Sequence, residues 1–326
     1  MRKNDSFETI TSVLQKAQSI VILPHILIDG DAAGSAIALS LALRAQGKTA
    51  HILIDETLPD HLSILNVDGY FITKEEALFS YDVAVAVDCS DTGRFSERNT
   101  FFERAKIKIN IDHHKTNHGF GDYHYVDQEA AATGEIIYDL MMCNHWEISV
   151  DCATALYVAI VTDTGQFQYS NTTAKTHKIA AHLYDLGIQA NQINIALYQN
   201  MRKEKMLLMG EILHIVEFYA KGRIGFGYAT REMMQKVNAE LQDTDGFVET
   251  LRDIKGVEIS IFVKEQEEKQ MKIGLRTKSS VDATQIVVPF GGGGHARAAG
   301  CTIIGSIEEV RDRIVSMAKQ VLENDA

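Results

Sequence analysis

The sequence predicts an α/β protein: an N-terminal domain built on a parallel sheet with helices on both faces, and a smaller α+β domain at the C-terminus. Three observations lead to this prediction. Short β-branched runs alternate with helical patterns through the first half of the chain, as in βαβ units. After Lys221 the pattern changes to a strand hairpin with separate helices. The length of 326 residues exceeds one average domain and suits two.

The N-terminal elements can be predicted in order along the chain. Residues 19–23, Ser-Ile-Val-Ile-Leu, have the composition of a buried strand. Residues 31–46 follow with a helical pattern that ends at Gly47, a residue typical of helix ends. Further strands are expected at residues 50–54, 82–87 and 107–111, and further helices near residues 130–142 and 151–161. Because ligands of parallel sheets bind outside the carboxyl ends of the strands, polar residues just after a strand are candidates for a site.

The remaining chain predicts a connecting segment and a second domain. Residues 173–210 are helical and more polar. Strands are then expected at residues 223–229, 258–264 and 271–276, with a hairpin turn at 265–270, and helices at 231–241, 247–254 and 307–322. We therefore expect an N-terminal domain over residues 1–190, a helical linker over 191–215 and a C-terminal domain over 216–326.

Composition excludes several classes of protein. A net charge of −12 argues against a protein that coats long nucleic acid, because repulsion opposes phosphate contacts. No apolar run approaches the roughly 20 residues needed to span a bilayer, so no membrane partner is expected. The four cysteines form no CxxC pair and are expected to be reduced, which favours a cytoplasmic location.

Four segments of the first half contain residue types that bind metals. They are residues 24–31 (Pro-His-Ile-Leu-Ile-Asp-Gly-Asp), 85–88, 110–114 (Asn-Ile-Asp-His-His) and 161–165. The first three each follow a β-run, and the fourth ends a helical pattern. Taken singly, an aspartate after a strand is more often a helix cap than a ligand, and Asp29 and Asp31 alone are explained equally well by either role. Together they favour a buried cation, since clustered carboxylates need compensation, and mixed imidazole and carboxylate ligands suit Mn²⁺, Fe²⁺ or Co²⁺.

A glycine-rich segment near the C-terminus is a candidate anion site. Residues 290–300 read Phe-Gly-Gly-Gly-Gly-His-Ala-Arg-Ala-Ala-Gly. Glycines alone would indicate only a turn before the strand expected at 301–304. The basic residues around them favour a pocket for a small anion in an otherwise acidic chain: Arg276, Lys278, His295 and Arg297.

These motifs resemble a known family. His25-x-x-x-Asp29-x-Asp31, Asp88, Asp112-His113-His114 and Asp163 are similar to the four motifs of the DHH phosphoesterase superfamily. The segment at 290–300 resembles the signature of the DHH-associated C-terminal domain. The two-domain length resembles the bifunctional oligoribonuclease and pAp phosphatase group (nano-RNase type). The resemblance implies hydrolysis of short oligoribonucleotides to mononucleotides and removal of the 3′-phosphate of pAp, with two divalent ions, Mn²⁺ above all.

The resemblance also implies roles for individual residues. One metal site would consist of His25, Asp29 and Asp88, and a second of Asp31, Asp88, His113 and Asp163, with Asp88 shared by both. The catalytic residues would be Asp88, His114, which would face the substrate phosphate and protonate the leaving group, and Asp112, which would orient a histidine.

Substrate would bind through the C-terminal domain, in a cleft between the domains. The residues implied are His114, Arg276, His295, Arg297, Gly293 and Gly294, with Lys278 as an addition. Partners are expected to be short RNA oligonucleotides or small nucleotides such as pAp and dinucleotides, not long nucleic acid. The sequence leaves the oligomeric state open, a homodimer included.

Other functions remain as alternatives. A phosphodiesterase of cyclic or linear dinucleotides (c-di-AMP or pApA, pGpG) is the main one. A family pyrophosphatase, a long-DNA exonuclease, a non-catalytic nucleotide-binding module and a metal-stabilised structural protein fit fewer of the motifs. Tyrosines near the motifs, at positions 123, 125 and 169, are expected to pack in the core in preference to stacking on a base, and Cys89 is expected to be buried beside the metal centre.

Overall fold

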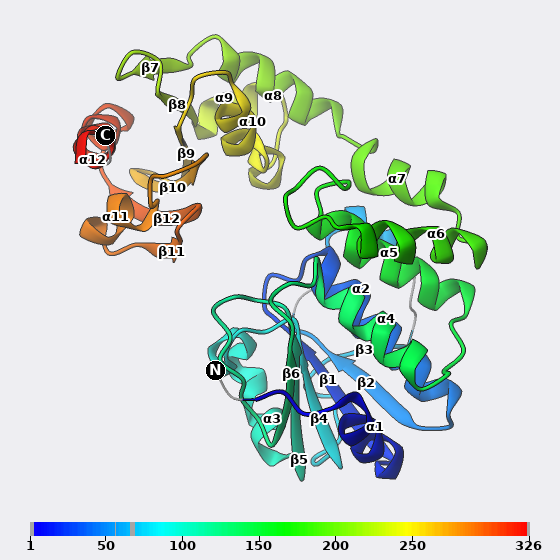
Figure 1. Cartoon of the computed structure of the whole chain (residues 1–326). Helices are drawn as coiled ribbons and strands as arrows, with labels where there is room; N and C mark the ends of the chain where they lie inside the picture. The colour runs from blue at the N-terminus through cyan, green and yellow to red at the C-terminus, as the bar shows by residue number, and fades with distance from the viewer. Residues whose placement is uncertain (1–2, 56, 66–68, 325–326) are drawn as a thin grey trace. The chain divides into compact units, whose positions relative to one another are not determined.

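The computed structural model describes the chain except for residues 1–2, 56, 66–68 and 325–326, and it does not describe the side chain of His295 (Figure 1). The chain divides into two compact units, Met1–Asn200 and Met201–Ala326. Among the described residues, no helix has the length and apolar composition that crossing a membrane would require.

The first unit is built on a six-stranded parallel sheet of order β3-β2-β1-β4-β5-β6. Its strands are β1 (Ser19–Pro24), β2 (Thr49–Leu53), β3 (Phe71–Ile72), β4 (Val83–Val87), β5 (Ile107–Asp112) and β6 (Tyr123–Val126). The sequence predicted four of them to within a residue at each end. It missed β3 and β6, which are short edge strands with little apolar pattern of their own.

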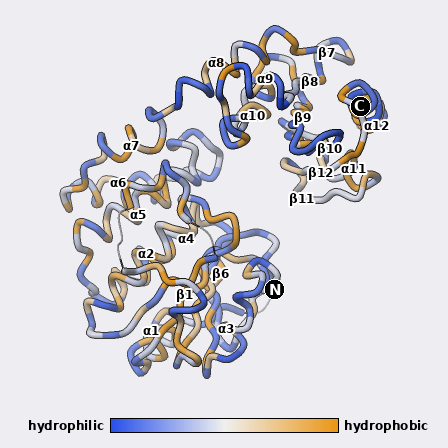
Figure 2. The backbone as a smooth tube through the Cα atoms, turned by 180° about the vertical axis from the view of Figure 1, so that it is seen from behind, coloured by the Kyte–Doolittle hydropathy of each residue, from blue (hydrophilic) through white to orange (hydrophobic). Residues whose placement is uncertain are grey.

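Helices cover both faces of this sheet, as predicted. They are α1 (Phe7–Lys16), α2 (Gly30–Ala45), α3 (Asn99–Arg104), α4 (Thr133–Cys143), α5 (Val150–Asp163), α6 (Ala174–Asp185) and α7 (Ala190–Tyr198), with the short 3-10 segments η1 (Asp60–Leu65) and η2 (Thr92–Arg98). Alternate residues of β1 belong to different cores, Ile20 and Ile22 to one and Val21 and Leu23 to the other. Since successive side chains of a strand point to opposite faces, this strand is buried from both sides. Figure 2 colours the chain by hydropathy, in which the residues of β1 are mostly hydrophobic.

Two closely packed helices, α2 and α5, carry the candidate ligands Asp31 and Asp163. Helices α2 and α5 approach each other at Gly34, where an added Cβ would lie 2.3 Å from the carbonyl oxygen of Ala155. Glycine therefore permits this close packing. It places the start of α2, with Asp29 as its N-cap, beside the end of α5, where Asp163 is the last residue.

The second unit is the predicted smaller α+β domain. Its sheet has the order β11-β12-β10-β9-β8-β7, and only the β8–β9 pair is parallel. The strands are β7 (Glu217–Tyr219), β8 (Ile224–Ala229), β9 (Ile259–Glu267), β10 (Gln270–Thr277), β11 (Gly293–His295) and β12 (Ala298–Ile304). The helical segments are α8 (Lys203–Leu213), α9 (Arg231–Lys236), η3 (Leu241–Thr244), α10 (Phe247–Asp253), α11 (Thr284–Val287), η4 (Val288–Phe290) and α12 (Ile307–Asn324).

Two details differ from the prediction for this unit. The helix expected at 231–241 ends at Lys236, because Asn238 adopts a left-handed backbone with φ 56°. The glycine-rich segment is not only a turn, since Gly293–His295 forms the edge strand β11 against β12. The hairpin expected at 265–270 is present between β9 and β10.

Candidate metal centre

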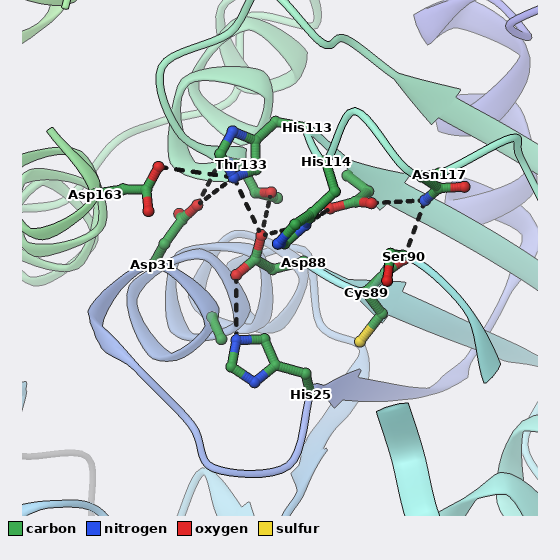
Figure 3. Close-up of polar contacts among 12 residues, drawn as sticks. His25, Asp31, Asp88, Cys89, Ser90, His113, His114, Asn117, Thr133 and Asp163 are labelled. Atoms are coloured by element: carbon green, nitrogen blue, oxygen red, sulfur yellow. Dashed lines mark hydrogen bonds and ion pairs between the residues drawn. The ribbon is translucent and has the colours of Figure 1, made fainter. Parts of the chain in front are cut away.

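The metal-ligand types of the first unit gather at the carboxyl edge of its sheet. Pro24, the last residue of β1, pairs with Val87 of β4, which pairs in turn with Ile111 of β5. The strands therefore end side by side, and the residues that follow them are neighbours: His25, Asp88 and the segment from Asp112 to His114. Figure 3 shows these side chains, with Asp31 and Asp163 from the helices, turned toward one another around Asp88.

The first group consists of His25, Asp29 and Asp88, whose ligand atoms lie within 4.8 Å of one another. Nε2 of His25 is 3.4 Å from an oxygen of Asp29 and 3.5 Å from Oδ2 of Asp88. The other ring nitrogen, Nδ1, lies 2.7 Å from the carbonyl oxygen of Ile26 and can donate to it. That bond fixes the ring and leaves Nε2 directed at the two carboxylates, which is how histidine ligands are commonly held.

The second group consists of Asp31, His113 and Asp163, also within 4.8 Å. Nε2 of His113 lies 3.7 Å from Asp31, 3.7 Å from Asp163 and 3.7 Å from Oδ1 of Asp88. Asp88 thus presents Oδ1 to this group and Oδ2 to the group of His25. One carboxylate lies between two sets of ligands, the arrangement that a shared ligand requires.

The electrostatics of these groups fit a bound cation. Burial, together with repulsion from Asp88, raises the pKa of Asp31 well above its usual value. Burial raises the pKa of Asp163 to about 6, although attraction to His113 opposes the shift. Within the described part of the chain, the ion pairs of Asp31, Asp88 and Asp163 are all with histidines. Since no lysine or arginine pairs with them there, protons or metal ions must compensate these buried carboxylates.

The histidines carry protons in the metal-free protein for the same reason. Burial disfavours the protonated ring of His25, but hydrogen bonds and attraction to Asp29 and Asp88 raise its pKa to about 10. Burial also opposes protonation of His113, and the attraction of Asp31, Asp88 and Asp163 raises its pKa to about 9. A divalent ion would replace these protons and use the same lone pairs, so the ligands present fit metal ions.

A third arrangement joins Asp112 to His114. Nδ1 of His114 lies 2.7 Å from Oδ1 of Asp112, which is fully buried. Nδ2 of Asn117 donates to the other oxygen of Asp112 at 2.6 Å. Burial opposes protonation of His114, but the hydrogen bond and attraction to Asp112 raise its pKa. Asp88, His113 and His114 also form a group that could hold a metal, but the His114 nitrogen facing Asp88 is Nδ1, which already bonds Asp112.

The amino end of α4 supports the centre, a feature that the sequence prediction missed. The backbone N–H groups of Thr133 and Gly134 donate to the two oxygens of Asp31 at 2.7 and 3.0 Å. The hydroxyl of Thr133 donates to Oδ1 of Asp88 at 2.8 Å, and that of Ser35 to Asp31 at 2.9 Å. The available signal was a threonine at the start of the helical pattern of residues 130–142, since free amide groups at helix starts bind carboxylates.

Of the predicted basic residues of the second unit, Arg276 and His295 lie on strands of one sheet, whereas Lys278 and Arg297 lie just outside the strands. Arg276 of β10 pairs with Ala298 of β12, which pairs with His295 of β11. Nε of Arg276 donates to Glu249 at 3.0 Å, so this charge is already paired. Arg297 donates to the carbonyl oxygen of Val281 at 2.8 Å and Lys278 to that of Ile254 at 3.1 Å. Gly293 and Gly294 lie on β11.

The predictions for Cys89 and for the tyrosines near the motifs have different outcomes. Cys89 is fully buried next to Asp88, as expected. Tyr123 and Tyr125 pack partly buried against the main core. The expectation of core packing is wrong for Tyr169, which is 54% exposed, because its loop leaves α5 at the surface.

Comparisons with known proteins agree with the motifs. The family described as DHH family, N-terminal domain, matches residues 19–160, and the DHHA1 domain matches residues 226–324. The chain is 32% identical to the bifunctional oligoribonuclease and PAP phosphatase NrnA of Thermus thermophilus, over 98% of this chain and 95% of that protein. It is 26% identical to the protein of the same name from Bacillus subtilis, over 91% and 93% of the two chains.

A solved structure supports the same conclusion. The crystal structure of an exopolyphosphatase-related protein from Bacteroides fragilis matches with a TM-score of 0.88 at 26% identity, covering 98% of this chain and 95% of that chain. The relatives bear the name of the group that the sequence motifs resemble. The chain therefore belongs to the DHH family of metal-dependent phosphoesterases, with a DHHA1 domain after its DHH domain.

Proposed function

We propose that this enzyme hydrolyses very short RNAs to mononucleotides and removes the 3′-phosphate of pAp, using two divalent ions, manganese in the working enzyme. The observation that carries the proposal is the position of Asp88, with one carboxylate oxygen facing each group of ligands. The names of the relatives from T. thermophilus and B. subtilis include both activities. The net charge of −12 fits a small substrate better than a long nucleic acid.

In this proposal each ligand group holds one ion. The first ion would be held by His25, Asp29 and Asp88, and the second by Asp31, His113 and Asp163 together with Asp88. Mixed carboxylate and imidazole ligands suit Mn²⁺. When bound, the two ions would activate a water for attack on phosphorus and offset charge on the phosphoryl oxygens.

His114 acts on the substrate in this proposal. Its Nδ1 is bonded to Asp112, so Nε2 is the nitrogen that can donate to a phosphoryl oxygen or to the leaving oxygen. Burial opposes protonation of His114, but the hydrogen bond and attraction to Asp112 raise its pKa, which favours the protonated ring. Asp112 is acceptor for both His114 and Asn117, which fixes the carboxylate and therefore the ring.

The second unit binds the far end of the substrate in this proposal. Arg276, His295 and Arg297 supply charge and hydrogen bonds, and Gly293 and Gly294 allow close approach of a ligand to the backbone. A terminal phosphate would take the place of Glu249 as the partner of Arg276. Arg276→Ala is then expected to raise KM for pAp with little change in kcat, and a normal KM would remove Arg276 from the binding site.

Two further parts of the proposal concern the protein as a whole. The four cysteines are free, which supports a reducing, cytoplasmic location. A homodimer is supported by an exposed apolar stripe on α8, formed by Met206, Leu207 and Leu213 at 57%, 54% and 56% exposure. Light scattering of the purified protein would measure its molar mass, and a value of one chain at micromolar concentration would rule the dimer out.

The proposed function can be tested by comparing substrates. Rates are measured with manganese on pGpG, a five-nucleotide RNA, pAp and cyclic di-AMP. Hydrolysis of the linear RNAs and pAp is expected, and a rate highest on cyclic di-AMP would favour a cyclic-dinucleotide phosphodiesterase instead. Asp88→Ala is expected to abolish hydrolysis while circular dichroism stays unchanged, since it removes the shared ligand. Asp185→Ala, an exposed aspartate of the same unit, is the matched control. Normal rates with Asp88→Ala would refute the two-ion assignment.

A further inference from the structure

Tyr169 is an exposed aromatic residue on the loop that follows the candidate metal ligand Asp163. Its side chain is 54% exposed. Aromatic residues bury a large apolar area when they find a partner, so an isolated exposed ring beside a site is a candidate contact for a ligand.

One face of the Tyr169 ring lies against a glycine. A Cβ added to Gly165 would lie 2.4 Å from Cζ of the ring and 2.6 Å from both Cε1 and Cε2. These nearly equal distances mean that the face of the ring, not its edge, covers Gly165. Only glycine permits this contact, and its backbone is also left-handed, with φ 53°. Because one face is covered and the side chain is half exposed, the opposite face is open to solvent.

Backbone hydrogen bonds hold the ring in this position. The N–H of Tyr169 donates to the carbonyl oxygen of Thr164 at 3.0 Å, and the N–H of Thr172 donates to that of Tyr169 at 3.1 Å. The side-chain amide of Asn171 donates to the carbonyl oxygen of Asp163 at 3.0 Å. The loop is therefore tied to the residue that would bind the metal, and little conformational freedom remains to be lost on binding.

The loop also has an unusual backbone. Gln166 and Phe167, which follow Gly165, have φ of 60° and 64°, a conformation uncommon for residues with a side chain. Strained backbone of this kind clusters at functional sites. Gly165 is two residues from Asp163, so their Cα atoms lie within about 7 Å of each other. The ring that covers Gly165 therefore lies close to the segment that carries Asp163.

We propose that the open face of Tyr169 stacks on a nucleobase of the substrate, so that the enzyme selects phosphate esters of nucleosides over esters without a base. This proposal rests on the proposed function, since it assumes that the phosphate of a nucleotide binds at the metal centre. Stacking suits a substrate of mixed sequence, because every base has an aromatic face. Tyrosine suits the role because its two side-chain torsions lose little entropy when they are fixed.

The test compares a dinucleotide with its abasic counterpart, in which both bases are replaced by hydrogen. With manganese, Tyr169→Ala is expected to raise KM for the dinucleotide on the order of 5- to 150-fold and to leave KM for the abasic compound unchanged. Tyr169→Phe, which keeps the ring, is expected to behave as the wild type. Tyr184→Ala is the matched control, because Tyr184 is 53% exposed in the same unit but lies on α6.

Each outcome decides the proposal. An equal rise in KM for both compounds would show that the ring only supports the loop, and unchanged values for both would show that no base touches it; either result overturns the stacking. Failure of the wild type to hydrolyse either compound would refute the proposed function instead. In that case the binding of AMP and of ribose 5-phosphate is measured by calorimetry with manganese. Tyr169→Ala that binds AMP more weakly than the wild type, but ribose 5-phosphate equally well, supports stacking. Tyr169→Ala that binds AMP as tightly as the wild type overturns it.

Discussion

Thr133→Val is the most informative change in this enzyme, because it removes one hydrogen bond to Asp88, the proposed shared ligand, and almost nothing else. Thr133 is fully buried, and its hydroxyl donates to Oδ1 of Asp88 at 2.8 Å. Valine has nearly the same shape, and its backbone N–H can still donate to Asp31 as that of Thr133 does. The expected result is weaker metal binding by an otherwise intact protein.

The size of the effect follows from the bond that is lost. A hydrogen bond to a charged group contributes about 1.5–3 kcal/mol. Loss of a partner that orients a metal ligand lowers metal affinity by about 10- to 100-fold, equivalent to about 1.4–2.8 kcal/mol, so the two ranges agree. Manganese affinity is measured by calorimetry on the metal-free protein. Thr133→Ser, which keeps the hydroxyl, is expected to bind manganese within a few-fold of the wild type.

Two results would refute this reasoning. Wild-type manganese affinity in Thr133→Val would show that the hydroxyl does not orient Asp88. An equal loss of manganese affinity in Thr133→Val and Thr133→Ser would show that the site responds to packing at this position, because serine retains the hydroxyl donor but not the methyl group. Urea unfolding in EDTA serves as the control, since a drop in stability without a drop in metal affinity is what a purely structural role predicts.

Three further predictions concern stability. Asp88→Asn is expected to lower the free energy of unfolding of the metal-free protein, because it removes the attraction of Asp88 for the protonated rings of His25 and His113; urea unfolding in EDTA that shows a gain would contradict this. The metal-free protein is also expected to lose stability as pH rises from about 4 to about 9. The folded-state pKa values of Asp163, about 6, and His113, about 9, lie above those of the unfolded chain, so the folded state holds more protons in that window. Thermal unfolding in EDTA at pH 6 and pH 9 checks the sign, and a higher Tm at pH 9 would be inconsistent with it. Gly34→Ala is expected to cost about 1–3 kcal/mol, since its Cβ would lie 2.3 Å from a carbonyl oxygen of α5, and unaltered urea unfolding would mean that the two helices separate easily.

The sequence predicted elements best where burial produced a clear apolar pattern. β1 and β4 are almost wholly buried, and their apolar runs, rich in valine and isoleucine in β1 and in valine and alanine in β4, marked them within a residue at each end. β3 has only two residues, both half-buried, so it left no pattern to detect. The helix that begins at Arg231 was predicted too long, because Asn238, a residue type that can adopt the left-handed backbone at a helix end, was not taken as its stop signal.

The linker region shows the same limit. Residues 173–210 were predicted as helical, and the structure has α6, α7 and the start of α8 there. Helical periodicity identified these residues as helical but did not show where one helix ends and the next begins. Those ends are set by local backbone geometry and tertiary contacts. The spacing of apolar residues indicates whether a segment is a helix or a strand, whereas the exact ends of that segment depend on how neighbouring parts of the chain pack against it.

The sequence by itself determined the candidate ligands of the metal centre. Imidazole and carboxylate groups after successive strands of a parallel sheet must meet at one edge, because all strands of such a sheet end on the same side. This reasoning named His25, Asp88 and His113 without any coordinates, and the structure brings both histidines close to Asp88.

Only the tertiary structure decided how these groups are held. The hydroxyl of Thr133 reaches Asp88 across 45 residues of chain, and the N–H of Thr133 reaches Asp31 across 102. It likewise showed that Arg276 is paired with Glu249 and that the half-exposed ring of Tyr169 lies on Gly165. Such contacts depend on angstrom-scale distances between elements, and a one-dimensional pattern carries residue type and spacing but not those distances.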